Sequence, residues 1–144
     1  MSESAVDTYL ETRGRGTLAF GDEDGGYAVP MSFGFDRENQ RCVFQFVSTA
    51  DSTKQAYLSD SNRVTLTVHD WSAIDDWTSV VVQGTLHELP ADERAVAAAT
   101  FKAHAAPVSF DVFNDGAADL EFEWYVLRVQ SKTGQRGVAR GGDN

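Results

Sequence analysis

The alternation of apolar and polar residues from Arg15 onward is the clearest pattern in the chain. Short segments in which every second residue is apolar are separated by clusters of Gly, Asp, Asn and Ser. Successive side chains of a strand point to opposite faces, so these segments predict half-buried strands and the clusters predict turns. The pattern favours an all-β barrel or sandwich, with helices in the minority.

The pattern predicts six strands and a few short helices. The strands are expected at residues 16–20, 27–35, 42–48, 63–69, 78–89 and 120–129. Helices are expected at 50–58, where Asp51 or Ser52 can cap the first turn, at 90–104, and briefly at 108–113. In the second strand large apolar residues alternate with small ones, so that its small face can admit something flat.

A chain of 144 residues with 42% hydrophobic residues is expected to form one folded domain. We expect residues 1–14 to be a lead-in, 15–130 to be the domain, and 131–144, which are polar and glycine-rich, to be a flexible tail. No run of about 18 apolar residues and no secretory signal is present, which predicts a protein that does not enter a membrane.

The charge balance limits the classes of partner that the protein is expected to bind. The chain has 22 acidic and 12 basic residues, for a net charge of −10, and this repels nucleic acid and anionic lipid. Only three of the basic residues are lysine, and the acids are mostly Asp. This composition favours a protein adapted to a salt-rich cytoplasm, such as that of a haloarchaeon, over an ordinary acidic protein. With Cys42 as the single cysteine there is no internal disulfide, which fits a reducing cytoplasm.

The residues that could bind a metal or act as a nucleophile form no recognisable motif. The three histidines, His69, His87 and His104, have no ligand spacing, so we expect no metal site. The chain has no G-x-S-x-G sequence, and Cys42 at a strand start is expected to pack rather than to react.

The segment 46–54 has the composition of a phosphate site. A strand ends in Ser48, and the following helix begins with Ser52, Thr53 and Lys54. Amides at a helix start are unpaired donors, to which hydroxyls and a lysine add. Plain N-capping beside a solvated lysine is the alternative.

Four motifs in this order resemble one family over most of the chain. They are 26–36, containing Val29-Pro30-Met31-Ser32, the strand leading to Ser52-Thr53-Lys54, the Arg63-Val64 pair, and 77–84. The chain resembles the FMN-binding split barrels related to pyridoxamine 5'-phosphate oxidase, and within them the small proteins grouped with nitroimidazole-resistance reductases. The resemblance implies a homodimer of six-stranded split β-barrels with FMN at the subunit interface.

The resemblance also implies which residues bind the cofactor. Val29, Pro30, Met31 and Ser32 would line the flavin ring, and Val47 would approach it by its backbone. Ser48, Ser52, Thr53 and Lys54 would hold the phosphate. Trp77, Ser79 and Gln83 would reach the flavin from the fifth strand. Independently of the family, Pro30 predicts a sheet edge or a bulge, because proline cannot donate to a strand partner.

Departures from the family pattern limit the expected activity. The oxidases have an arginine where Thr53 stands, and basic residues where this chain has Ala28 and Phe33. The tail also lacks their substrate-binding motif. Pyridoxamine 5'-phosphate oxidation is therefore not the expected activity. Trp71, Trp77 and Trp124 could each cover a flavin or fill a core, and Trp77 is favoured because it lies in the matching fifth strand.

These observations lead to a hypothesis with open alternatives. We expect an FMN-dependent oxidoreductase acting on a small-molecule substrate or electron donor, with no catalytic side chain assigned, because the flavin performs the chemistry. The same fold could bind a deazaflavin or haem instead. A flavin-binding or storage protein without turnover is the third possibility.

Overall fold

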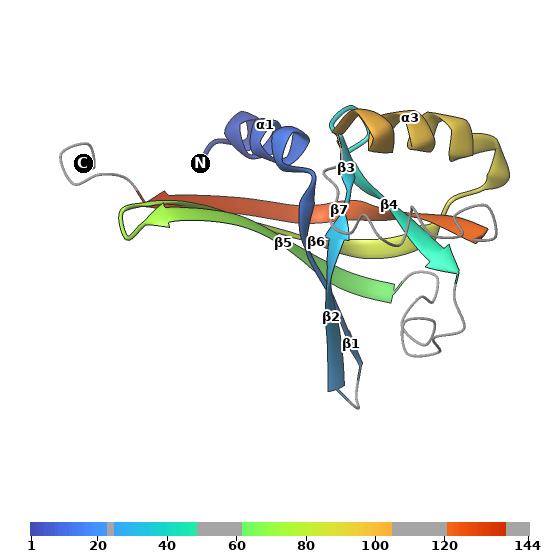
Figure 1. Ribbon diagram of the computed structural model, residues 1–144, viewed down its shortest axis with the longest axis horizontal. Helices are drawn as coiled ribbons and strands as arrows, with labels where there is room; N and C mark the ends of the chain where they lie inside the picture. Colours follow the sequence, from blue (N-terminus) through green and yellow to red (C-terminus); the bar gives the residue numbers. More distant parts are fainter. Residues whose placement is uncertain (23–24, 49–61, 105–120, 138–144) are drawn as a thin grey trace.

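The computed structural model describes residues 1–22, 25–48, 62–104 and 121–137. Within these residues, seven strands form one antiparallel sheet in the order β2-β1-β5-β6-β7-β4-β3, and two helices, α1 and α3, lie on the same side of it (Figure 1). The predicted mainly β class is confirmed. The strands are β1 (Arg15–Asp22), β2 (Gly25–Ser32), β3 (Gly34–Asp36), β4 (Arg41–Ser48), β5 (Asn62–Ala73), β6 (Asp76–Glu88) and β7 (Glu121–Gly137).

The predicted strand 27–35 is two strands, which is why the sheet has seven rather than six. β2 pairs with β1 and β3 pairs with β4, and the break is at Phe33, whose backbone N–H donates to the carbonyl of Gly14 over 2.9 Å. β2 and β3 are consecutive in the chain but lie at opposite edges of the strand order. The sheet must therefore curl until its edges meet at Phe33, which makes it a barrel.

The last strand is longer than predicted. Residues 131–137 were expected to be flexible, but they continue β7 and pair with residues 77–83 of β6. The register shifts beside Gly84, where Gln130 is the extra residue of a β-bulge. Residues 131–137 form a strand although they are polar, because their backbone pairs with β6 and their outward side chains face solvent. Apolar alternation, the signal used to predict strands, is therefore absent from this segment. The rest of the expected tail, 138–144, lies outside the described residues.

The expected lead-in contains a helix, α1 (Glu3–Arg13). The Ser2 side chain caps it by accepting from the N–H of Ala5 over 3.1 Å, and Gly14 ends it with a φ of 68°. Val6 and Leu10, four residues apart, are buried against the barrel. Helix α1 is thus part of the core rather than a peripheral segment.

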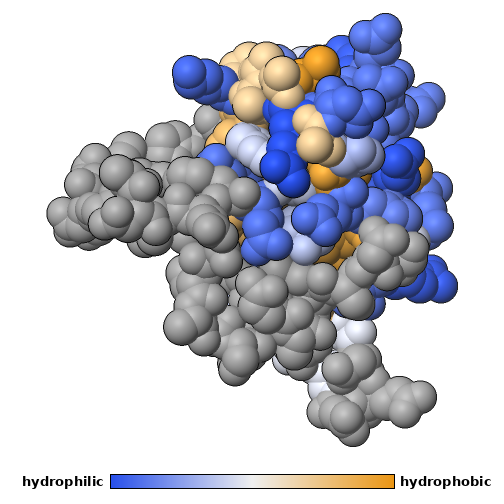
Figure 2. Space-filling view, turned by 90° about the vertical axis from the view of Figure 1, so that its right-hand side faces the viewer, coloured by the Kyte–Doolittle hydropathy of each residue, from blue (hydrophilic) through white to orange (hydrophobic). Residues whose placement is uncertain are grey.

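The predicted helix at 90–104 is present as a short 3₁₀ turn, η1 (Ala91–Glu93), followed by α3 (Arg94–His104). It covers β3, β4 and β7, where Ala97 and Leu89 pack with Val43 and Val126. On its outer side Val96 is exposed, and Figure 2 shows apolar atoms over α3 among mostly hydrophilic ones. The helices expected at 50–58 and 108–113 lie outside the described residues.

The barrel core is aromatic and aliphatic, with Phe33, Phe35, Phe44 and Phe46 fully buried. These side chains come from β3, β4 and the link at Phe33, where the two sheet edges meet. Cys42 packs in the same core, and its burial raises the pKa of the thiol well above the ordinary range. A thiol held neutral and out of solvent does not act as a nucleophile, in agreement with the packing role expected from the sequence.

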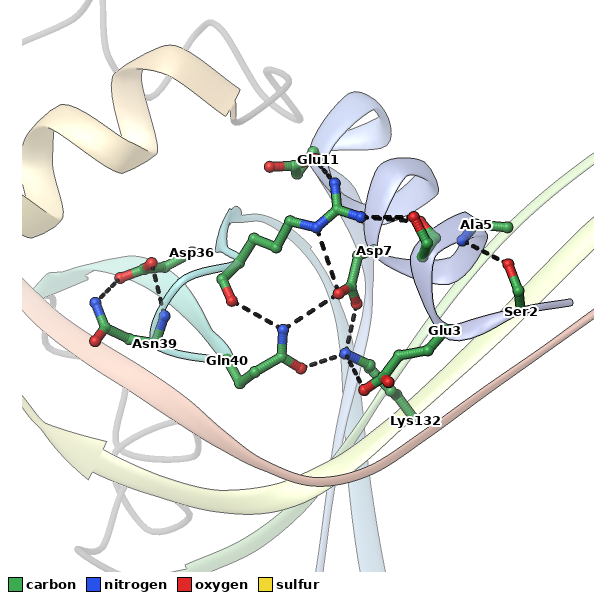
Figure 3. A network of polar contacts seen from close by, with 11 residues as sticks. Ser2, Glu3, Ala5, Asp7, Glu11, Asp36, Asn39, Gln40 and Lys132 are labelled. Carbon is green, nitrogen blue, oxygen red and sulfur yellow. Dashed lines mark hydrogen bonds and ion pairs between the residues drawn. The ribbon is translucent and has the colours of Figure 1, made fainter.

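A buried polar cluster fastens α1 to β7 (Figure 3). The Lys132 ammonium lies 2.5 Å from Asp7 Oδ1 and 3.6 Å from Glu3 Oε2, and it donates to the Gln40 side-chain oxygen. Arg37 adds a second ion pair to Asp7 at 3.5 Å. The side chains of Lys132 and Asp7 are only 7% and 8% exposed. One hydrogen bond to Gln40 and ion pairs with Asp7 and Glu3 hold the Lys132 ammonium, so this lysine has a structural role.

Candidate functional site

The predicted ring-lining residues lie on an edge strand. β2 occupies one end of the strand order and pairs only with β1, where Pro30 is the partner of Thr17. The edge position expected from Pro30 is confirmed, and the pairing is regular there. Met31 is buried, whereas Ala28 and Pro30 are exposed on the other face. β2 therefore presents a face of small side chains to the outside.

Across from β2 lies the part of β4 beyond Val43, which the described strands pair on the β7 side only. The β3–β4 pairing runs from Asp36 and Arg41 to Gly34 and Val43. If it continued past Phe33 in the same register, Pro30 would stand opposite Val47. In the described part of the chain, however, no strand pairing joins β2 to β4. Among the strands that the structure describes, the barrel is therefore split between β2 and β4.

The predicted phosphate residues begin at the same place. Val47 and Ser48 are the last residues of β4, where their backbones pair with Phe122 and Glu121 of β7. β4 ends at Ser48, beside the split, and Ser48 is the first of the predicted phosphate contacts. Ser52, Thr53 and Lys54 lie outside the described residues, so their predicted role stays a prediction.

The predicted fifth-strand contacts lie elsewhere in the same chain. Trp77, Ser79 and Gln83 are on β6, on the face opposite to the buried Val80 and Val82. β1 and β5 separate β6 from β2. At about 4.8 Å per strand this is roughly 14 Å across the sheet. One chain does not bring the β2 and β6 residues together around one point.

Two of these β6 residues, Trp77 and Ser79, line a pocket that the sequence analysis did not predict. The pocket measures about 420 Å³ and is lined by His69, Asp70, Trp71, Trp77, Thr78 and Ser79. Trp71 is 68% exposed and is the direct cross-strand partner of Trp77. The β5–β6 register brings these residues together. The sequence named Trp71 as a flavin or core candidate, but only a prediction of that register could have placed it beside Trp77 and His69.

Trp124 does not join this pocket. It lies on β7, where its ring packs edge-on against Phe101 of α3 at 5.5 Å between ring centroids. Of the two readings that the sequence left open, packing against the helix is the one found. Trp77 remains the better candidate for ligand contact, because it lines the pocket and Trp124 does not.

Titratable groups near the pocket are held by their neighbours. The Tyr9 hydroxyl donates to Asp70 over 2.6 Å, and Arg13 forms an ion pair with the same carboxylate. Burial and the hydrogen bond to Asp70 raise the pKa of Tyr9 to about 12. Among the described residues, no group of three or more His, Cys, Asp or Glu side chains could hold a metal ion.

Comparison with known proteins identifies the family. A family model described as pyridoxamine 5'-phosphate oxidase matches residues 2–136. The chain belongs to this family. The resemblance seen in the sequence motifs is thereby confirmed, and the match includes the extended β7. No curated protein matches the chain in sequence.

Solved structures share the fold of this chain. The FAD binding protein from Mycobacterium smegmatis superposes with a TM-score of 0.70 at 18% identity, covering 96% of this chain and 98% of that one. A FAD-binding protein from Mesorhizobium loti gives 0.70 at 20% identity, covering 93% and 94%. The FAD and heme binding protein from Mycobacterium smegmatis gives 0.71 at 14%, covering 99% and 75%. These likenesses show that the chain has the split-barrel fold.

No helix in the described residues is long and apolar enough to cross a membrane.

Proposed function

We propose that the protein is a flavin-binding split barrel that holds FMN between two copies of the chain and works as an oxidoreductase. The observation that carries this proposal is the family match over residues 2–136, joined to the split between β2 and β4 at the predicted ring site, where no described strand pairs the two. Similar structures described as FAD binding add support for a flavin. When bound, the flavin supplies the transfer of electrons.

The residues at the split fit a flat, polar-edged ring. Ala28 and Pro30 leave the outer face of β2 without bulky side chains, and Pro30 lacks an N–H that would need a partner. Backbone groups along β2 and around Val47 would bond the edge of such a ring. The hydroxyl of Ser48 and the residues Ser52, Thr53 and Lys54 would then hold the phosphate at the end of β4.

A second copy would complete the site. Within one chain, β1 and β5 separate Trp77, Ser79 and Gln83 from β2, so these residues would reach a ligand bound there from another subunit. The outer face of β2, β1, β5 and β6 is free of charge at its centre, where Pro30, Thr17, Thr67 and Val81 follow one another as cross-strand partners. In a chain with 24% charged residues such a face suits a subunit interface.

The first experiment is the visible spectrum of the protein purified in molar salt, with chromatography of whatever heat releases. Flavin bands and released FMN would support the proposal, and reduction by a nicotinamide donor would support the enzyme over a storage protein. Released FAD would keep the flavin and replace FMN. A Soret band or a deazaflavin spectrum would overturn the flavin assignment. A similar structure is described as binding both FAD and heme, which makes the Soret outcome the leading rival.

The phosphate assignment has a separate test. Lys54→Ala removes one charge-assisted contact and should weaken FMN binding by about 1.5–3 kcal/mol, roughly 10- to 150-fold, in a fluorescence titration. Lys102→Ala is the matched control, because Lys102 is an exposed lysine on α3. Unchanged affinity in the Lys54 variant would remove the segment 48–54 from the site.

We also propose that the acidic surface is an adaptation to salt. The chain carries only three lysines, and its net charge of −10 repels itself where salt does not screen it. Circular dichroism during dialysis from molar to low KCl should show loss of structure. A protein that keeps its spectrum would be an ordinary acidic protein.

A further inference from the structure

The pocket on β5 and β6 is built from two cross-strand pairs on the same outward face. Trp71 is the partner of Trp77, and the next pair on that face is His69 with Ser79. Residues directly opposite in an antiparallel pair have Cβ atoms about 4.5–5.5 Å apart. The two indoles therefore stand side by side at one end of the pocket, while an imidazole and a hydroxyl stand at the other.

Trp77 is held in place by β7. An added Cβ at Gly137, its cross-strand partner, would lie 2.1 Å from Trp77 Nε1 and 2.6 Å from Cε2. The indole therefore covers the bare backbone of Gly137, and any side chain at 137 would displace it. Trp71, by contrast, is 68% exposed and has no such cover. The pocket has one fixed aromatic wall and one that a ligand can cover.

The charges around the pocket select among planar ligands. None of its six lining residues is Lys or Arg, and the segment 69–79 contains Asp70, Asp75 and Asp76. Arg13 pairs with Asp70, so an anionic ring would meet the remaining carboxylates without a compensating cation in the lining. A neutral or cationic ring would stack on indole faces, which attract apolar and positive groups.

We propose that this pocket binds a planar aromatic ring that bears no negative charge. Its role as the substrate site rests on the proposed function: in a dimer, Trp77 would be the wall shared with the flavin, and the ring between Trp77 and Trp71 would be the reaction partner. His69 and Ser79 would contact polar atoms at the end of that ring. The substrates would then be compact aromatic compounds rather than phosphorylated ones.

Three matched probes test the charge and the shape together: quinoline, N-methylquinolinium and quinoline-3-carboxylate. Equilibrium dialysis measures each without relying on tryptophan as a reporter. We expect the neutral and cationic probes to bind and the carboxylate to bind weakest. Trp71→Ala and Trp77→Ala should each weaken quinoline about five- to tenfold, the range of a lost stacking partner. Gly137→Ala should do the same by displacing Trp77.

The control is Trp124→Phe, which changes a tryptophan that packs on α3 and should leave quinoline binding unchanged. Binding that is indifferent to Trp71 and Trp77, or equal for the carboxylate and the cation, would overturn the proposal. Competition between quinoline and FMN would assign the pocket to the cofactor's own ring and overturn the substrate role. Tryptophan-dependent quinoline binding by a protein that takes up no flavin would support the ring site while the proposed function fails.

Discussion

Lys132 shows at the level of one residue how packing changes the meaning of a sequence. It stands in a polar, glycine-containing segment that predicts a flexible tail, yet its ammonium is buried between α1 and the barrel. The acidic partners come from the first turns of α1 and the amide from the β3–β4 turn, more than ninety residues away in sequence. Sequence reasoning had no local signal for this contact, because buried ion pairs are made between distant segments.

Removing the charge of Lys132 should therefore lower the stability of the folded protein. Lys132→Met leaves Asp7 buried with only the more distant Arg37 and a hydrogen bond from Gln40, and it should lower the free energy of unfolding by about 3–5 kcal/mol. Denaturant titration measures this. Lys102→Met, on the exposed surface of α3, should stay within about 0.5 kcal/mol of the parent. If the two variants are equally stable, the cluster in Figure 3 does not fasten α1.

The raised pKa of Tyr9 predicts a loss of stability at high pH. The pKa of its hydroxyl is raised from the ordinary 10.0 to about 12 by burial and by the hydrogen bond to Asp70. A raised pKa means that the folded state holds the proton more tightly, so this contribution is complete below about pH 10 and is lost as the pH rises through about 12. Tyr9→Phe should remove that part of the decline. Unfolding curves of the variant and the parent that stay parallel from pH 9 to 12 would contradict the assignment.

At the level of elements, strands with apolar alternation were predictable and elements that depend on distant contacts were not. β1, β4, β5 and β6 show the alternation and are present near their expected places. The β2–β3 break was hidden because both strands alternate in phase, and only barrel closure at Phe33 separates them. Helix α1 was missed although Ser2 and Gly14 are ordinary helix-end residues, because its short apolar stripe is weak without the surface it covers.

Gly84 provides a test of the β6–β7 pairing. A Cβ at this position would lie 1.9 Å from the backbone carbonyl oxygen of Arg128 and 2.7 Å from a Leu127 methyl carbon, beside the bulge at Gln130. Backbone on a neighbouring strand cannot move aside cheaply, so Gly84→Ala should cost about 3 kcal/mol, at the upper end for overpacking. Gly21→Ala, whose nearest atom is 3.9 Å away, should change the unfolding midpoint little. Similar midpoints for both variants would mean that the bulge adapts.

At the level of the whole molecule, the sequence motifs predicted the family and the edge position of Pro30, but not how the site is assembled. The motifs predict contacts from β2, from the end of β4 and from β6, and within one chain the strand order keeps the β2 and β6 groups apart. A list of matching residues contains no information on which subunit supplies each one. The pocket at Trp71 and His69 was not predictable either, since it depends on the β5–β6 register.

If a dimer holds the cofactor as proposed, a single substitution at the interface should remove both. Val81 lies at the centre of the uncharged outer face, next to Thr67, and its side chain belongs to neither core cluster. Val81→Asp would place two carboxylates near each other across an interface, which should weaken the dimer on the order of 100-fold or more while each chain stays folded. Sedimentation velocity and the flavin spectrum measure the two effects. Val96→Asp on α3, where Val96 is 59% exposed, should change neither. A monomeric Val81 variant that keeps its flavin would show that one chain holds the cofactor alone, and a variant that stays dimeric would move the interface to another face.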